Sequence, residues 1–276
     1  MRIAIVTDST ADIPHELAHH FNIHVIPAIL IIDGQSIEDG KGLSRREFYE
    51  RLPAMQTSPT TSTPSAGKFH EVYDSLIKQG FQKIISIHVS SLLSGIYNTA
   101  HTAAQAFGDH VHVLDSKQLS LGTGFQVLEA AKAIAKGFSV EKVLQKIEST
   151  RQRVRVFAML DTLEYVRLSG RVSWARARIG SFLQIKPFLE VKDGKVLSLG
   201  QTRTRKKGIP HLMSLLDGIG QIEQLAILHT NAEKDAHDIR EKLNIALVDQ
   251  PFIVNVTTIV GTHVGPNGLG LAAVIK

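Results

Sequence analysis

The first half of this chain alternates short apolar runs, rich in β-branched residues, with segments of helical periodicity. Such alternation predicts a parallel sheet whose strands are joined by crossover helices. The expected strands span 2–8, 24–31, 83–89 and 111–116, and the expected helices span 13–21, 66–78, 95–107 and a run from Gly124 to a glycine cap at Gly137. A further helix, capped by Ser139, is expected to run to Thr150 and to end the first domain.

The second half mixes helices with antiparallel strands. Asp193-Gly194 separates two runs of alternating apolar residues, which is the strongest short-range signal for a β-hairpin. Other strands are expected at 154–160, near Ala226, near Phe252 and at the C-terminus, and helices after a Thr162 cap, at 172–183 and near Lys234. We therefore predict an α/β protein with an N-terminal parallel-sheet α/β domain, residues 1–150, and a C-terminal α+β domain, residues 151–276.

The formal net charge of +5 comes from the second half of the chain. Residues 1–150 carry 13 basic and 15 acidic side chains, and residues 151–276 carry 18 and 11, which gives −2 and +7. Such an excess favours an anionic ligand or partner, although solvated surface charge explains it equally well. Nucleic acid is not expected as a partner, because only 6% of the residues are aromatic and no stacking motif accompanies the basic residues.

The chain contains no cysteine, which excludes disulfides, thiolate nucleophiles and thiolate metal ligands. The N-terminal sequence MRIAIVTDST turns polar after six residues, and the longest apolar run, 25–32, is interrupted by Pro27. Neither segment matches a signal peptide or a membrane-spanning helix. The expected location is therefore cytoplasmic.

Hydroxyl side chains cluster at each predicted strand-to-helix joint of the first half. The clusters are DST after the first strand, TTSTPS at 60–65, VSSLLS at 89–94 and DSKQLSLGTG at 115–124. In an open parallel sheet, ligands bind beyond the carboxyl ends of the strands, where helix N-termini present unpaired N–H groups. Each hydroxyl taken alone is explained as an ordinary helix cap, whereas the four clusters together predict an edge that faces an anion.

Several catalytic and cofactor motifs are missing from the sequence. No segment matches GxxxxGK[ST], and the GTG at 122–124 does not complete a dinucleotide fingerprint, so neither ATP nor NAD binding is indicated. Ser94 lacks the GxSxG context of a nucleophile elbow, but a triad of Ser94, His263 and an aspartate stays open on chain order alone. No metal site is predicted, because His15 and His19 share a helix face without an obvious carboxylate ligand.

His263 differs from the other histidines in its surroundings. It lies in GTHVGPNGLG, residues 261–270, where four glycines predict a loop whose backbone can take strained conformations beside a ligand. A structural histidine in a tight turn is the alternative interpretation.

Seven motifs, in order along the chain, resemble those of the DegV family of bacterial fatty-acid-binding proteins. They are VTDSTADIP (6–14), TTSTPS (60–65), SSLLSGIYNTA (90–100), LDSKQLSLGTG (114–124), LEYVRLSGRVS (163–173), IKPFLEVKDGKV (185–196) and GTHVGPNGLG (261–270). The resemblance covers nearly the whole chain. Three positions depart from the family pattern: Ser169 precedes Gly170 where two glycines are common, Asn267 stands where a glycine follows the proline, and Trp174 is unexpected.

The resemblance implies a protein that binds one long-chain fatty acid, such as palmitate, stearate or oleate, between or beneath its two domains. Such a protein presents the carboxylate to a separate ATP-dependent fatty acid kinase subunit, which makes the acyl phosphate used in phospholipid synthesis. The resemblance therefore implies a lipid-binding substrate carrier and not an enzyme, with no catalytic residue, no metal and no cofactor of its own.

The resemblance also assigns residues to the head group of the fatty acid. Those expected to bind the carboxylate are Thr61, Ser62, Ser94, Gly95 and His263. Arg171 is expected to compensate the carboxylate charge or to face the kinase. The basic run RTRKKG (203–208) and the pair Arg176 and Arg178 could dock an acidic kinase surface, make a transient contact with an anionic membrane surface, or simply be solvated.

Two other functions stay open on the sequence. One is a stand-alone serine hydrolase that uses Ser94 and His263. The other is a binder of small ketones, related to the dihydroxyacetone kinase domain, in which His263 attaches covalently to the ketone.

Overall fold

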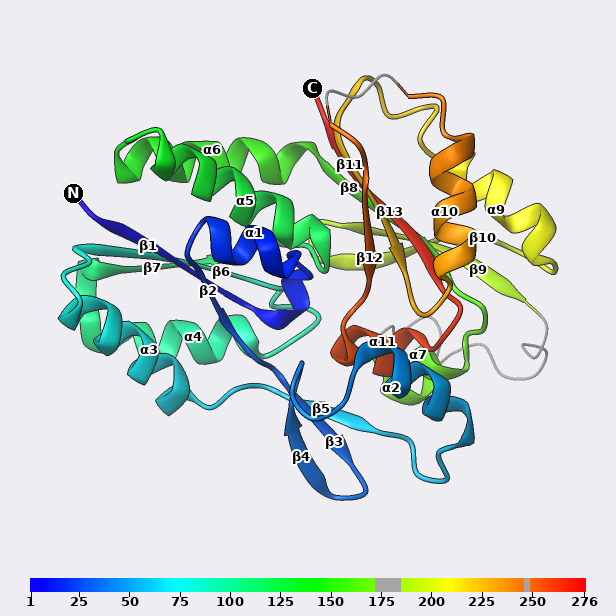
Figure 1. The fold of residues 1–276 in the computed structure, drawn as a ribbon, viewed down its shortest axis with the longest axis horizontal. Helices are drawn as coiled ribbons and strands as arrows, with labels where there is room; N and C mark the ends of the chain where they lie inside the picture. The colour runs from blue at the N-terminus through cyan, green and yellow to red at the C-terminus, as the bar shows by residue number, and fades with distance from the viewer. Residues whose placement is uncertain (172–184, 246–248) are drawn as a thin grey trace. The chain divides into compact units, whose positions relative to one another are not determined.

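The computed structural model describes residues 1–171, 185–245 and 249–276, which belong to two compact units (Figure 1). Unit 1 comprises Met1–Ile29, Ser62–Arg153 and Asp193–Lys195, and unit 2 comprises Leu30–Thr61, Val154–Lys192 and Val196–Lys276. The sequence predicted two contiguous halves that meet at residue 150. Instead, one segment of each half belongs to the other unit. Leu30–Thr61 packs within unit 2, and Asp193–Lys195, the tip of the predicted hairpin, packs within unit 1.

Unit 1 is built on a four-stranded parallel sheet, as the sequence predicted. Its strands are β1 (Ile3–Asp8), β2 (Ile23–Ile26), β6 (Lys83–His88) and β7 (Val111–Asp115), in the order β2-β1-β6-β7. All six residues of β1 are buried, so both faces of this central strand are covered. An unbroken apolar strand of this kind is typical of a parallel sheet with helices on both faces.

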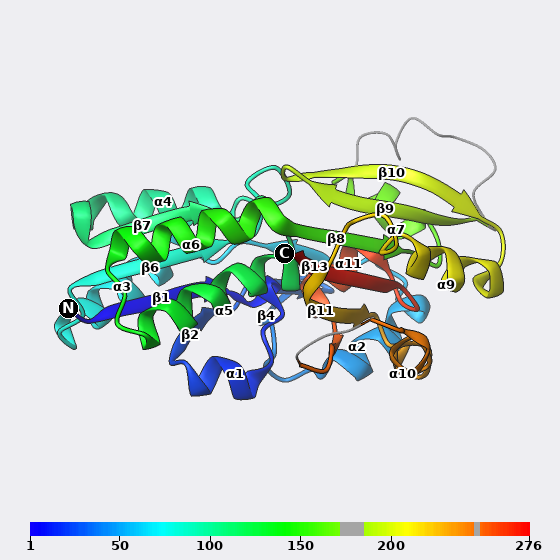
Figure 2. The ribbon, with the colours of Figure 1, turned by 90° about the horizontal axis from the view of Figure 1, so that it is seen from above.

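The helices of unit 1 form two layers, one on each face of this sheet (Figures 1 and 2). They are α1 (His15–His20), α3 (Ala66–Lys78), α4 (Ile96–Ala104), α5 (Leu121–Ala135) and α6 (Val140–Arg153). Helix α5 packs on β1 and β6, and α6 lies beside it on the same face of the sheet, whereas α3 and α4 pack together on the opposite face. The predicted helices are confirmed, with ends shifted by a few residues.

One predicted strand of the first half is wrong. Residues 24–31 do not form a single strand: β2 ends at Ile26, and β3 (Ile29–Ile32) begins a separate sheet after Pro27. Proline has no N–H to donate to a ladder, so it ends the pairing of β2. The second sheet has the order β4-β3-β5 and adds β4 (Gln35–Glu38) and β5 (Thr60–Ser62), neither of which was predicted.

Unit 2 contains a six-stranded mixed sheet. Its strands are β8 (Val154–Met159), β9 (Lys186–Lys192), β10 (Lys195–Thr202), β11 (Ile222–His229), β12 (Phe252–Asn255) and β13 (Leu269–Ile275), in the order β10-β9-β8-β13-β11-β12. Strand β13 pairs antiparallel with β8 and β11, and β11 pairs parallel with β12. The α+β character predicted for the second half is therefore confirmed.

The helices of unit 2 fall into two groups. Helices α9 (Arg205–Ser214) and α10 (Glu233–Lys242) bury Leu212 and Ile239 in a core shared with Met159 and Leu271 of the sheet. Helices α2 (Arg45–Arg51), α7 (Glu164–Ser169) and α11 (Thr258–Val264) form the second group, in which α11 packs against both α2 and α7. The predicted helix at 172–183 lies outside the described residues.

The predicted hairpin at Asp193-Gly194 is confirmed. Both residues have positive φ, 49° and 79°, as a two-residue type I′ turn requires. The Gly194 N–H donates to the carbonyl of Lys117 at 3.0 Å, and the Ser90 hydroxyl donates to the carbonyl of Gly194 at 3.0 Å. These bonds explain why the tip belongs to unit 1.

None of the helices in the described part of the chain is long and apolar enough to cross a lipid bilayer.

A fully buried polar network fastens the carboxyl ends of β1 and β6 to α3. Asp8 Oδ2 lies 2.9 Å from His88 Nδ1, His88 Nε2 lies 2.7 Å from Ser86 Oγ, and Ser86 Oγ lies 2.8 Å from the hydroxyl of Tyr73. The other carboxylate oxygen of Asp8 accepts from the N–H and the hydroxyl of Thr10. Each side chain in the network is satisfied, so the network stabilises the edge of the sheet.

We expect Asp8→Asn to lower the free energy of unfolding by about 3 kcal/mol, because an amide group turns one acceptor of this buried network into a donor. Asp74→Asn is the matched control: it removes an exposed ion pair with Lys78 and should cost less than about 1 kcal/mol. Urea unfolding followed by circular dichroism measures both losses. Equal losses in the two variants would show that the buried network contributes no more than a surface pair.

Candidate functional site

The segment that carries His263 is a helix and not the glycine-rich loop that the sequence predicted. Helix α11 begins at a Thr257 cap, whose side chain accepts from the N–H of Val260 at 3.3 Å. Its last turn closes when the N–H of Gly265 donates to the carbonyl of Gly261 at 2.8 Å. His263 therefore projects from the final turn of a short helix, which fixes its backbone.

Tyr49 of α2 holds the start of α11 in place. Its buried hydroxyl lies 2.9 Å from the carbonyl oxygen of Val256 and 3.1 Å from that of Thr257. A Cβ atom at Gly261 would overlap the phenol ring of Tyr49, so only glycine lets the helix lie this close to α2. Gly261, the first glycine of the GTHVGP motif, thus allows α11 to pack closely against Tyr49 two residues before His263.

The chain after α11 is fixed by a second tyrosine and by a left-handed asparagine. Gly265 has a φ of 78°, and a Cβ atom there would overlap the ring of Tyr165 on α7. Asn267 has a φ of 60°, and its N–H donates to the carbonyl of Thr230 at 2.6 Å. Asparagine tolerates the left-handed region better than most residues, so it replaces the glycine expected after the proline without changing the turn.

The structure brings Thr61 and His263 together. Thr61 lies on β5, and its Oγ1 is 2.9 Å from Nε2 of His263, with both residues in unit 2. The other ring nitrogen, Nδ1, is buried and has no hydrogen-bond partner among the described residues. The pair carries two protons, one on the hydroxyl and one on the ring; one of them makes the hydrogen bond between the two side chains, and the other can be donated to an incoming acceptor.

The charge state of the pair follows from its surroundings. Burial, with a smaller effect from the positive charge of Arg171, lowers the pKa of His263 to about 4. At neutral pH the ring is therefore uncharged and retains one N–H donor. The positive charge near the pair belongs to Arg171, which is exposed and donates to the carbonyl of Ser169 at 2.6 Å.

The turn that presents Arg171 explains one departure from the family pattern. Gly170 caps α7 with a φ of 70°, and its N–H donates to the carbonyl of Val166 at 3.2 Å. Ser169 is still helical, so only the second position of the turn requires glycine. Trp174, Arg176 and Arg178 lie outside the described residues.

The remaining predicted residues belong to unit 1. Ser62 is exposed, and its hydroxyl lies 3.4 Å from the carbonyl oxygen of Thr63. Ser94 is half-buried, and its oxygen accepts from the N–H of Ile96 at 3.3 Å as α4 begins. Gly95 is exposed, and a Cβ atom there would lie 3.3 Å from a methyl carbon of Thr63. Unit 1 thus brings Gly95 next to the TTSTPS segment.

The prediction that all four hydroxyl clusters face an anion is wrong. Thr10, Ser116 and Ser120 are buried and bond to partners inside unit 1, namely the carboxylate of Asp8, the hydroxyl of Thr123 and the carboxylate of Asp12. Ser90 is equally buried and serves the hairpin tip. Most of these hydroxyls therefore satisfy the backbone and side chains at the ends of the strands, as ordinary caps do.

The described residues offer little support for hydrolase chemistry. No carboxylate among them bonds to His263, whose Nδ1 would need an orienting acid in a triad. Asp8, His88 and Ser86 do line up in the order of a triad, but Ser86 is fully buried and bonded to Tyr73. Within residues 1–171, 185–245 and 249–276, no three His, Asp or Glu side chains are grouped as metal ligands.

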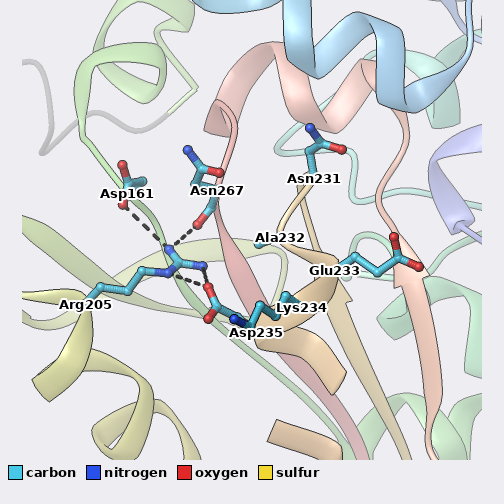
Figure 3. Close-up of a pocket in the computed structure, with 8 residues that line it drawn as sticks. All are labelled: Asp161, Arg205, Asn231, Ala232, Glu233, Lys234, Asp235 and Asn267. Carbon is cyan, nitrogen blue, oxygen red and sulfur yellow. Dashed lines mark hydrogen bonds and ion pairs between the residues drawn. The ribbon is translucent and has the colours of Figure 1, made fainter. Parts of the chain in front are cut away.

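A hollow of about 350 Å³ lies elsewhere in unit 2, at the N-terminal ends of α9 and α10 (Figure 3). None of the predicted head-group residues lines it. Its walls carry the carboxylates of Asp161, Glu233 and Asp235, with Arg205 already paired to two of them. Lys234 also lines the hollow, so three carboxylates face two cations, and this excess of negative charge disfavours a carboxylate ligand.

Sequence reasoning missed the residues that position the site. Tyr49 and Asp39, whose carboxylate accepts from the Thr258 hydroxyl at 2.7 Å, fix α11 without belonging to any motif, and Tyr165 lies in the LEYVRLSGRVS motif but was not singled out. A usable signal was present: Thr257 is a good cap, and the apolar residues that follow it have helical spacing up to Gly265.

Comparison with known proteins gives matches over the whole length of the chain. A family model described as "Uncharacterised protein, DegV family" matches residues 2–276. A DegV domain-containing protein of Staphylococcus aureus (strain COL) is 33% identical over 276 residues, covering 99% of this chain and 98% of the relative.

Two solved structures share the fold over their full length. A DegV family protein from Thermus thermophilus, described as fatty acid binding, is 30% identical with a TM-score of 0.93, and 100% of both chains are covered. The DegV protein of Bacillus subtilis, also described as a fatty acid binding protein, is 33% identical with a TM-score of 0.88 and the same coverage.

His263→Gln should flatten part of the dependence of folding stability on pH. The pKa of this histidine is about 4 in the folded chain and 6.5 in its ordinary state. The unfolded chain therefore binds the proton more readily, so the stability is fully present above pH 6.5 and is lost as the pH falls toward 4. The part due to His263 is roughly 3 kcal/mol at most.

Urea unfolding at a series of pH values measures this slope. The exposed His19→Gln is the control and should leave the slope as in the wild type. A slope that is identical in wild type and His263→Gln would contradict the burial of a neutral ring.

Proposed function

Because this chain belongs to the DegV family, we propose that it binds one long-chain fatty acid non-covalently and presents the carboxylate to a partner kinase. The observation that carries the proposal is the Thr61–His263 pair, which is partly buried, uncharged and adjacent to the charge of Arg171. Fatty acid binding by two structural relatives, at 30% and 33% identity, supports the ligand class.

The proposed head-group site replaces the water that a carboxylate loses on binding. A fatty acid has a carboxyl group with a pKa close to that of glutamate, about 4.3, so it enters charged at neutral pH. Burying that charge without donors costs several kcal/mol. The Thr61–His263 pair supplies one donor to the carboxylate, the O–H of Thr61 when the Nε2–H of the neutral ring donates to the Thr61 oxygen, and Arg171 compensates the charge.

The family resemblance adds three further residues to this proposal. Ser94 is half-buried, and its hydroxyl proton has no acceptor among the described residues. Ser62 follows Thr61 directly along β5, and Gly95 offers its backbone beside Thr63. We assign all three to the carboxylate together with Thr61 and His263.

The acyl tail supplies most of the affinity. About fourteen methylenes of a sixteen-carbon acid, at ~0.8 kcal/mol each, contribute roughly 11 kcal/mol before the cost of ordering. The head group therefore sets the position and orientation of the acid, and the tail sets the strength of binding. Phe188 belongs to the core that α9 and α10 cover, so its burial is explained without a ligand.

The protein acts in this proposal as a substrate carrier, and phosphoryl transfer belongs to a separate ATP-dependent kinase. A carboxylate held by neutral donors and one arginine keeps its nucleophilic oxygens available to an incoming phosphoryl group. The proposed location is the cytoplasm, where such a kinase has ATP.

The purified protein should release about one equivalent of long-chain fatty acid on solvent extraction. Mass spectrometry of the extract identifies the acid, and the denatured protein should show its unmodified mass, because the ligand is not covalently bound. Protein that releases no fatty acid and takes up neither oleate nor palmitate when they are added would overturn the proposal.

Thr61→Val should weaken oleate binding about tenfold, because it removes one hydrogen bond to a charged group and keeps the shape of the side chain. Formation of acyl phosphate by the cognate kinase should fall in proportion when oleate is limiting. Thr102→Val is the matched control, since Thr102 is exposed on α4 and, within the described part of the chain, its hydroxyl bonds only to the carbonyl of Asn98 at 2.9 Å. Equal affinity of the two variants would reject the role of Thr61.

A further inference from the structure

The basic run RTRKKG contains one arginine that differs from its neighbours. Arg203, Lys206 and Lys207 are exposed, whereas the side chain of Arg205 is 25% exposed. Arg205 is also the first residue of α9, where the helix dipole disfavours a positive charge. The interaction of Arg205 with the dipole of its own helix therefore does not explain why its side chain is partly buried at this position.

Arg205 joins three separate segments of unit 2, as Figure 3 shows. Its Nε donates to Asp235 Oδ2 at 2.6 Å, and its Nη2 lies 2.5 Å from the same oxygen. Its Nη1 donates to the carbonyl of Asn267 at 2.5 Å and lies 3.6 Å from Asp161 Oδ1. Lys186 holds Asp161 from the other side. Nε and Nη1 thus donate to groups of the protein, whereas Nη2 is buried and makes no hydrogen bond to the described residues although it lies close to Asp235.

Two of these segments lead directly to the head-group residues. Asn267 ends the turn that follows α11, four positions after His263, and its N–H donates to the carbonyl of Thr230. Asp161 precedes α7, which ends in the turn that presents Arg171. Between them, the ring of Tyr165 on α7 packs against Gly265. Arg205 therefore ties together the two backbone segments whose spacing sets the distance from Arg171 to His263.

We propose that Arg205 is a positioning residue for the fatty acid head group, which acts by fixing the end of α11 and the start of α7 relative to each other. This inference rests on the proposed function for its ligand. It also divides the basic run by role: Arg205 is internal to the fold, and Lys206 and Lys207 face solvent.

The geometry requires arginine in particular. A planar guanidinium can address a carboxylate, a backbone carbonyl and a second carboxylate in different directions at once, whereas the ammonium group of lysine is a single point charge. Arg205→Lys therefore keeps the net charge and loses the connection between the segments. This contrast separates positioning from long-range electrostatic attraction.

Arg205→Lys should raise the Kd for oleate about tenfold and shift the NMR signals of the His263 ring in the fatty-acid-free protein. Lys206→Gln is the matched control, because it removes a whole charge from the same turn of α9 and should change neither quantity. The His263 signals are identified by their loss in His263→Gln. Where Arg205→Lys fails to fold, Asp235→Asn weakens the same connection more mildly and should shift the same signals.

Wild-type affinity together with wild-type His263 signals in Arg205→Lys would overturn the inference. So would equal effects of Lys206→Gln, since net charge would then account for the result. If the wild-type protein takes up no fatty acid, the proposed function fails, yet displaced His263 signals in Arg205→Lys would still support the positioning role. The two ideas are therefore tested by different readouts.

Discussion

The hydrogen bond between Thr61 and His263 joins residues 202 positions apart, and the candidate site depends on it. Neither partner could be held at 2.9 Å by its own segment alone. β5 is a strand of three residues, and α11 has seven. The bond forms because Gly261 and Gly265 let the helix lie against two tyrosine rings, a contact that any larger residue would prevent.

The electrostatics of the site follow from the same packing. Burial keeps the His263 ring neutral at physiological pH, so the ring acts as a hydrogen-bond donor and the full positive charge is left to the exposed Arg171. A neutral donor beside a separate positive charge suits a carboxylate that must be held without being protonated. The hollow lined by Asp161 and Asp235, by contrast, uses its arginine to satisfy its own carboxylates.

Much of the fold was predictable from local pattern. Alternating apolar runs and helical periods gave the parallel sheet of unit 1, and Asp193-Gly194 gave the hairpin, because both depend on neighbouring residues. The same patterns missed the break at Pro27, the short strand β5 and the exchange of Leu30–Thr61 into unit 2. Short strands carry almost no periodicity, so their pairing is decided by partners far away in the chain.

The proposed head-group residues were identified from motif resemblance, and Tyr49 and Arg205, which we infer to position them, were identified only from the structure. Tyr49 binds the backbone carbonyl groups of Val256 and Thr257, and Arg205 binds that of Asn267 besides the carboxylates of Asp235 and Asp161; a carbonyl partner leaves no trace in the sequence.

By itself, the sequence determined the class of fold, the hairpin, and the set of hydroxyl, imidazole and guanidinium groups available to an anion. Tertiary structure decided which of those groups meet. Most hydroxyls at the ends of the strands form hydrogen bonds inside unit 1, whereas Thr61 and His263 bond to each other in unit 2. The physical reason is that local propensity acts over a few residues, whereas a hydrogen bond between distant segments requires close packing that only the folded chain provides.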